Sequence, residues 1–157
     1  MAVVWSPIGL RRVVLPQGSK EMVLSQVTGG NYFAREVSFS RYPELVGEIK
    51  DCLCGREVEF HCKLDFSGIS RFQKEVYEVV RSIPRGQTRS YSWVARALGR
   101  PNSARVVGQS LARNPFPIVV PCHRVISSDG SLGGYSGGVE LKKRLLELER
   151  PQVWVHL

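Results

Sequence analysis

The chain has 157 residues, enough to bury a core as one ordinary domain or as two small ones. Its composition, with 43% hydrophobic and 23% charged residues, is that of a soluble globular protein, and no apolar run approaches the roughly 20 residues of a membrane-spanning helix. The apolar run that starts at Ala2 has no basic segment before it, so we expect no secretory signal and no membrane anchor. The expected location is intracellular, cytoplasmic or, in a eukaryote, nuclear.

The net charge of +8 lies entirely in the second half of the chain. Residues 1–66 hold eight basic and eight acidic side chains, whereas residues 67–157 hold fourteen basic and six acidic ones. Eleven of those fourteen basic residues are arginine. A basic field confined to one half favours a polyanion as partner, with nucleic acid first, over a surface that is cationic only for solubility.

The first part of the chain indicates a hairpin. Residues 3–5 and 10–15 are apolar strand candidates, and the turn signal Ser6-Pro7-Ile8-Gly9 separates them. Residues 16–40 show no clear pattern, so no element is predicted there.

A helix and a strand are predicted next, which makes residues 1–66 a small α/β unit. From Arg41, leucine or isoleucine recurs at every fourth position starting at Leu45, until Gly55 ends the run. In residues 57–64 apolar and polar residues alternate strictly, as in a strand with one buried face.

Four cysteines, at positions 52, 54, 62 and 122, are too few for a disulfide framework, and we expect them to be mostly reduced. Cys52 and Cys54 together with His61-Cys62 have the residue types of a zinc site. Adjacent strand residues point to opposite faces, and Cys52 and Cys54 lie on opposite sides of their helix. We therefore expect core cysteines and an exposed Cys54 rather than a metal site.

The second half is predicted to be mainly helical. Apolar residues from Phe72 to Val80 form an amphipathic stripe that Pro84 ends. Residues 90–113 have the proportions of a helix-turn-helix with glycine in the turn. Arg105 and Arg113 share the outward face of the second helix, although such pairs also occur in proteins that never touch DNA.

Cys122 follows an apolar, strand-like run at 118–120 that Pro121 ends, so it lies where regular structure breaks. A thiol of ordinary pKa, about 8.5, is only a few per cent thiolate at neutral pH, and a reactive cysteine needs help to lose its proton. His123 is the obvious base. On a strand the two neighbouring side chains would diverge, so their contact needs an irregular backbone or a bridging water.

A helix over 139–149 supplies a third member. Its leucines mark the inward face, and Glu149 lies at the edge of that face, where a carboxylate is unfavourable unless it is partnered. We expect Glu149 to orient His123, the alternative being a solvated salt bridge.

Five short motifs between residues 70 and 150 stand apart from these patterns. They are Ser90-Tyr91, Ala104-Arg105-Val106-Val107-Gly108, Asn114-Pro115-Phe116-Pro117, Pro121-Cys122-His123-Arg124-Val125 and Gly133-Gly134-Tyr135-Ser136-Gly137-Gly138. Their identity, order and spacing resemble the O6-alkylguanine-DNA alkyltransferase family, the methylated-DNA–protein-cysteine methyltransferases. Over residues 1–66 only the size and the α/β pattern fit.

The resemblance implies an α/β + α fold. A small ribonuclease H-like α/β N-terminal domain, residues 1–66, would precede a mainly helical C-terminal domain, residues 67–157. That second domain would be winged helix-turn-helix-like, with the helix-turn-helix at about 90–113, and would bind DNA and accept the alkyl group.

The resemblance also implies single-turnover DNA repair by a monomer. Double-stranded DNA containing O6-alkylguanine would be bound from the minor groove, the damaged guanine flipped outward, and its alkyl (methyl) group moved to Cys122. The product is a thioether, which water cannot hydrolyse as it does an acyl-enzyme, so the protein is consumed. No metal or organic cofactor is expected, and ligands for the N-terminal zinc of some relatives are not recognisable.

The matching positions imply a role for each site residue. The catalytic residues would be the nucleophile Cys122 with His123, Glu149, Asn114 and Tyr91, the last also as a proton donor. The residues expected at the DNA are Tyr91, Ser103, Ala104, Arg105, Gln109, Arg113 and Arg124. The substrate pocket would contain Pro117, Val125, Tyr135, Ser136 and Gly137. Arg105 would fill the vacated base stack, and Gln109 departs from the smaller residue common in the family.

Three rival interpretations remain. An alkyltransferase-like protein that only flags lesions carries another residue at the cysteine position, so Cys122 argues against it. A transcription regulator and a Cys-His hydrolase each leave most of the five motifs unexplained. The range of alkyl groups accepted is not predicted.

Overall fold

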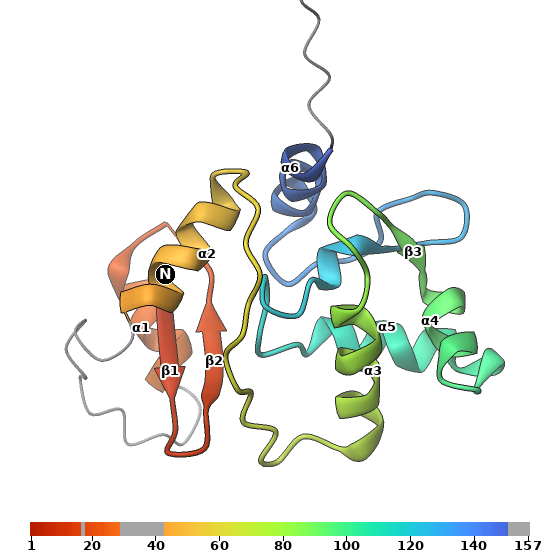
Figure 1. The fold of residues 1–157 in the computed structure, drawn as a ribbon, viewed down its shortest axis with the longest axis horizontal. Helices are drawn as coiled ribbons and strands as arrows, with labels where there is room; N and C mark the ends of the chain where they lie inside the picture. Colours follow the sequence, from red (N-terminus) through yellow and green to blue (C-terminus); the bar gives the residue numbers. More distant parts are fainter. Residues whose placement is uncertain (17, 29–42, 151–157) are drawn as a thin grey trace, which may run out of the picture.

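The computed structural model describes residues 1–16, 18–28 and 43–150. Its elements, in chain order, are β1 (Ala2–Trp5), β2 (Leu10–Val14), α1 (Lys20–Thr28), α2 (Pro43–Leu53), α3 (Arg71–Arg81), β3 (Arg89–Ser90), α4 (Tyr91–Ala97), the 3-10 turn η1 (Pro101–Ser103), α5 (Ala104–Ala112), the 3-10 turn η2 (Cys122–Arg124), β4 (Val125–Ile126) and α6 (Val139–Glu149). In Figure 1 the hairpin lies with α1 and α2 on one side, and α3, α4 and α5 lie on the other.

The predicted hairpin is confirmed. β1 pairs antiparallel with β2, from Ala2 opposite Val14 to Trp5 opposite Leu10. Its turn is held by Ser6, whose hydroxyl accepts from the Ile8 amide at 3.1 Å. Two short strands with a local turn need no distant partner to set their register.

The helices of the first half agree in part with the sequence. The predicted helix is described from Pro43 to Leu53, while its expected start at Arg41 lies outside the described residues. The stretch 16–40, for which the sequence predicts nothing, contains α1 in its described part.

The predicted strand over 57–64 is wrong. The segment, drawn in yellow in Figure 1, is extended, and among the described residues its only strand-type pairing is an isolated parallel bridge between Leu10 and Leu64. The alternation reflects one-sided burial instead, since Val58 and Phe60 are half-buried while Glu57 and Glu59 are exposed. An alternating pattern indicates which face is buried and not whether a neighbouring strand is present.

The predicted helices of the second half are confirmed. α3 begins at a capping box, in which Ser70 accepts from the Gln73 amide and the Gln73 side chain accepts from the Ser70 amide. α4 and α5 form the expected pair around η1, and α6 ends at Glu149. Among the described helices, none is long and apolar enough to cross a membrane.

One hydrophobic cluster joins the two halves of the chain. It contains Leu10 and Ile49 from the first half and Tyr77 and Leu145 from the second. Phe116, fully buried, makes edge contacts with the rings of Tyr77 and Phe66, at centroid distances of 6.2 and 5.7 Å. The division at residues 66 and 67 stays a prediction.

β2 also contacts the segment that leads to Cys122. The amide of Val13 donates to the carbonyl of Pro115 at 2.8 Å. The hairpin therefore positions the chain that enters the candidate site.

Replacing Phe116 with alanine tests how far the shared cluster stabilises the fold. We expect Phe116→Ala to lower the free energy of unfolding by about 3–5 kcal/mol, because a buried aromatic ring is lost and a cavity remains. Urea unfolding measures this change. Ile8→Ala, at a side chain that is 51% exposed, is the control and should change stability by less than about 0.5 kcal/mol. Equal effects of the two substitutions would contradict the role of Phe116.

Candidate active site

The backbone before Cys122 is irregular, as the sequence requires for contact with His123. The strand-like run at 118–120 is a turn, in which the Val120 amide donates to the Phe116 carbonyl at 2.8 Å. Ile118 has a φ of 74°, a left-handed conformation that a β-branched residue rarely adopts. Cys122 then opens the 3-10 turn η2, and the expected strand is corrected to a turn.

The Cys122 thiol is buried and has one side-chain hydrogen bond. The Asn114 Nδ2 atom donates to Cys122 Sγ at 3.1 Å and to the Val120 carbonyl at 3.1 Å. The Asn114 Oδ1 atom accepts from the Phe116 amide at 2.9 Å, which fixes the amide so that its nitrogen faces the sulfur. Asn114 thus presents a donor to the thiolate that forms when Cys122 loses its proton.

The pKa of Cys122 is held by opposing effects. Burial raises the pKa of the thiol, whereas the Asn114 hydrogen bond and the charge of Lys142 lower it. The net direction is upward, so the resting sulfur is a thiol, and the site must supply a base.

His123 and Glu149 are in contact, as the sequence predicts. His123 Nε2 lies 2.9 Å from Glu149 Oε1, and both side chains are buried. Arg124 completes the group, with Nε 2.9 Å from Oε2 and Nη2 2.8 Å from Oε1 of Glu149. The carboxylate therefore receives three donor atoms from two neighbouring residues.

The charges in this group assign the histidine tautomer. Although burial acts to raise it, the pKa of Glu149 is lowered to about 2 by the hydrogen bonds from His123 and Arg124, so this carboxyl is ionised. Burial lowers the pKa of His123, which is therefore neutral. An ionised carboxylate only accepts, so Nε2 carries the proton and Nδ1 is left with a free lone pair. Nδ1 is buried and has no hydrogen-bond partner among the described residues.

The predicted pocket residues surround the glycine-rich loop. Pro117 and Val125 are buried, Tyr135 and Gly137 half-buried, and Ser136 exposed. A Cβ atom at Gly137 would lie 2.9 Å from Leu141 and 3.0 Å from Tyr135, so a larger residue would require these side chains to shift. The Tyr135 hydroxyl is buried and has no partner among the described residues, and burial raises the pKa of Tyr135.

Tyr91 lies beside α5 and the loop. Its ring is 3.7 Å from the place of a Cβ at Gly108, and its hydroxyl is 3.0 Å from that of a Cβ at Gly133. Burial and the nearby Cys122 raise the pKa of Tyr91, which keeps its hydroxyl protonated as a donor requires. At Gly133 the absence of a side chain leaves room for the hydroxyl, whereas at Gly108 a Cβ would be in ordinary contact with the ring.

The outward face of α5 is as the sequence predicts. Arg105, Gln109 and Arg113 are exposed, and Ser103 and Ala104 are half-buried at its start. Contact of these residues with DNA stays a prediction.

A polar groove that was not predicted lies beside α4 and β4. Its hydroxyls are linked, since Ser92 Oγ is 2.9 Å from both Ser90 Oγ and Ser128 Oγ. Arg89 and Arg96 line the same groove. Serine-rich segments are common, so the sequence offered no specific signal for it.

Comparison with known proteins agrees with these features. The model of the family described as 6-O-methylguanine DNA methyltransferase, DNA binding domain, matches residues 71–151. The chain belongs to this family. A relative from Methanothermobacter thermautotrophicus, named a methylated-DNA–protein-cysteine methyltransferase, is 46% identical over 151 residues, which are 95% of this chain and 78% of the relative.

Solved structures of methyltransferases of this family have the same mixed α/β fold. The O6-methylguanine methyltransferase of Mycobacterium tuberculosis aligns with a TM-score of 0.72 at 33% identity, covering 94% of this chain and 90% of its own. The O6-methylguanine-DNA methyltransferase of Pyrococcus kodakaraensis gives 0.73 at 33% identity, covering 94% and 89%. A structure of the M. tuberculosis protein OGT in complex with DNA gives 0.65 at 39% identity, covering 73% and 74%.

One expected DNA-binding residue of this family member is corrected. Arg124 was expected at the DNA, but its guanidinium faces Glu149, and its Nη1 donates to the Ile83 carbonyl at 2.7 Å. Its side chain is only 15% exposed. A guanidinium engaged in this way is not available to a phosphate, so Arg124 belongs with the buried group around Glu149.

Lys142 is a site residue that sequence reasoning missed. It is fully buried, and its ammonium donates to the Val125 carbonyl at 2.6 Å and to the Leu132 carbonyl. Burial lowers its pKa. A signal was present, because Lys142 lies three residues before Leu145 and seven before Glu149, on the same helix face.

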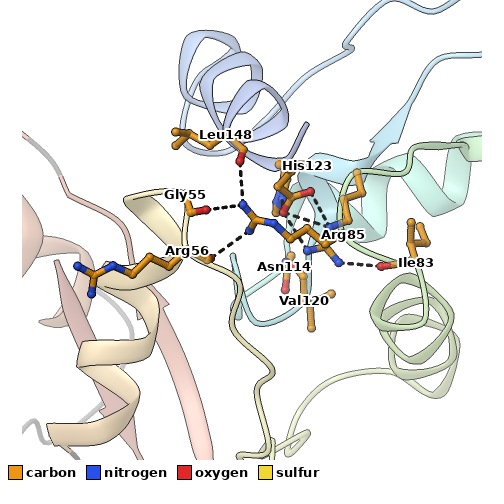
Figure 2. A network of polar contacts seen from close by, with 10 residues as sticks. Gly55, Arg56, Ile83, Arg85, Asn114, Val120, His123 and Leu148 are labelled. Carbon is orange, nitrogen blue, oxygen red and sulfur yellow. Dashed lines mark hydrogen bonds and ion pairs between the residues drawn. The ribbon is translucent and has the colours of Figure 1, made fainter. Parts of the chain in front are cut away.

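Arg85 was missed as well. It donates to the carbonyls of Gly55 at 2.6 Å, Arg56 at 3.1 Å and Leu148 at 2.7 Å (Figure 2). It therefore ties the segment after α2 to the last turn of α6, one residue before Glu149. Backbone carbonyls leave no residue-type pattern, so the sequence carried no signal for this contact.

Glu149 should make stability depend on acid pH. Its folded pKa of about 2 lies below the value of about 4.3 of an unfolded chain, so its stabilisation is present above the unfolded value and lost as pH falls toward 2. We expect about 3 kcal/mol to be lost in this window, and Glu149→Gln to lack this loss. Urea unfolding between about pH 6 and about pH 2 measures it. Glu147→Gln, on the exposed face of α6, is the matched control, and an unchanged pH slope in Glu149→Gln would refute the assignment.

Proposed function

We propose that this chain is a DNA repair protein that moves the alkyl group of O6-alkylguanine in double-stranded DNA to its own Cys122. The observation that carries the proposal is the buried thiol in contact with Asn114 beside the His123–Glu149–Arg124 group. It is supported by the activity named for the relatives and by the complex of a similar protein with DNA.

Binding would use the basic half of the chain. In this proposal it forms a winged helix-turn-helix-like domain, residues 67–157, behind a ribonuclease H-like domain, residues 1–66. α5 lies in the minor groove, and the groove of serines and arginines beside α4 takes backbone phosphates. A stacked base hides its O6 substituent, so the damaged guanine is flipped outward and Arg105 fills the stack.

The proton of Cys122 goes to His123. The free lone pair of Nδ1 accepts this proton directly or through a water. The Nε2–H group meanwhile keeps its hydrogen bond to Glu149. The imidazolium that forms is stabilised by the ionised carboxylate. Asn114 donates to the new thiolate, whose charge would otherwise be poorly solvated in this buried site.

The thiolate then attacks the alkyl carbon in line with the C–O6 bond. The S–C bond forms, the C–O6 bond breaks, and its electron pair stays on guanine, which takes a proton from the Tyr91 hydroxyl. The proton that His123 received from Cys122 then returns through solvent to the Tyr91 phenolate, so that both side chains end neutral. The backbone amide of Ser136 faces O6, and the carbonyls of Cys122 and Val125 accept from the exocyclic amine. The thioether is stable to water, so each monomer acts once, and the steps use no metal or organic cofactor.

Transfer to Cys122 is tested with a duplex oligonucleotide containing O6-methylguanine. We expect intact-protein mass measurement to show one added methyl per chain and peptide mapping to place it on Cys122. Cys122→Ala should take up none, whereas Cys54→Ala, at an exposed cysteine, should react as the native protein does. Methyl on another residue, or repeated turnover on an ester, would overturn the proposal.

The role of Arg105 is tested separately. We expect Arg105→Ala to repair the duplex about tenfold more slowly, because the extruded base is no longer replaced in the stack. Its reaction with free O6-benzylguanine should be unchanged, since a free base leaves no gap. Arg144→Ala, at an exposed arginine of α6, is the control. Equal slowing on duplex and free base would remove the stacking role.

A further inference from the structure

A cleft of about 370 Å³ opens beside the candidate active site, between β2, the end of α5 and the glycine-rich loop. Pro117, Ser136 and Gly137, which we assign to the substrate pocket, form part of its wall. Asn114 lines it too, and its amide contacts Cys122 Sγ at 3.1 Å. Asn114 therefore connects the cleft with the sulfur.

Three arginines also line this cleft. They are Arg11 and Arg12 of β2 and Arg113 at the end of α5, and the described residues that line the cleft include no Asp or Glu. Arg11 is partly compensated by Asp65 at 3.5 Å. In the described part of the chain, no carboxylate lies within ion-pair distance of Arg12 or Arg113.

This charge matters because the nucleophile is negative. A thiolate at Cys122 would repel a carboxylate on the incoming substituent, whereas the charge of Glu149 is already compensated by Arg124. Arg11, Arg12 and Arg113 would offset that repulsion for a substituent long enough to enter the cleft past Pro117, Ser136 and Gly137. A neutral substituent would gain little from them.

We propose that this cleft binds the outer part of the O6 substituent, and that the chain accepts substituents ending in a carboxylate better than neutral ones of equal size. The inference rests on the proposed alkyl transfer. For O6-carboxymethylguanine, Cys122 sulfur bonds to the methylene carbon, the bond from that carbon to O6 breaks, and guanine keeps the electron pair and takes a proton. The carboxylate stays on the protein, facing Arg12 and Arg113.

The test uses free-base probes that differ only in charge. These are O6-benzylguanines with a 4-carboxy, a 4-carbamoyl or a 4-aminomethyl group, and the readout is the rate of adduct formation on Cys122. We expect the carboxy probe to react about fivefold faster than the carbamoyl probe, and Arg12→Gln to abolish that ratio without changing the carbamoyl rate. Arg12→Glu should favour the aminomethyl probe. Arg144→Gln, an exposed arginine outside the cleft, should leave all ratios unchanged.

Duplexes containing O6-methylguanine or O6-carboxymethylguanine separate the alternatives. Slower carboxymethyl but unchanged methyl transfer by Arg12→Gln supports the proposal. Equal slowing of methyl and carboxymethyl transfer would assign the cleft to DNA backbone phosphates. Equal rates for the three free-base probes, in the native protein and in every variant, would mean that the cleft does not respond to the charge of the substituent. Either result overturns the proposal. Failure of methyl transfer by the native protein would instead reject the underlying repair function.

Discussion

A buried carboxylate is stable only where its charge is compensated, and Glu149 depends on Arg124 for that compensation. This ion pair also helps to hold neighbouring segments in place. Arg124 donates to the carbonyl of Ile83, and Arg85, two residues after Ile83, donates to the carbonyl of Leu148, the residue before Glu149. The loop after α3, the turn that contains Cys122 and the end of α6 are thus closed into one polar ring, in which His123 has a single orientation.

Two polar side chains near Cys122 in the chain are held by different contacts. His123 has a free lone pair because Glu149 holds its proton on the other nitrogen, and Asn114 donates to the sulfur because Phe116 and Val120 hold its amide. In the proposed reaction, neither group needs to rotate when charge moves to the sulfur. The turn geometry makes this possible, since neighbouring residues on a strand would face apart.

Local patterns predicted what depends on local physics. Periodicity and caps located α3 to α6, and the apolar face of α6 indicated that Glu149 needed a partner. The strand at 57–64 failed because alternation reports burial and not pairing. Arg85 was missed, and Arg124 was expected at the DNA, because the atoms that accept their hydrogen bonds come from distant segments of the chain. An arginine is usually exposed, so its type alone does not indicate a buried contact. Lys142 shares a helix face with Leu145 and Glu149, but a lysine is usually exposed, so its burial was not predicted.

The burial of Cys122 also bears on its exposure to oxidants. In the proposed reaction the thiol is used once, so an oxidant that reaches it first would inactivate the protein, and oxidation follows thiolate character and exposure. Cys122 is 4% exposed with a raised pKa, whereas Cys54 is open to solvent. The burial of Cys122 raises the pKa of its thiol and so makes a base necessary. The same burial therefore protects the unreacted thiol from oxidation.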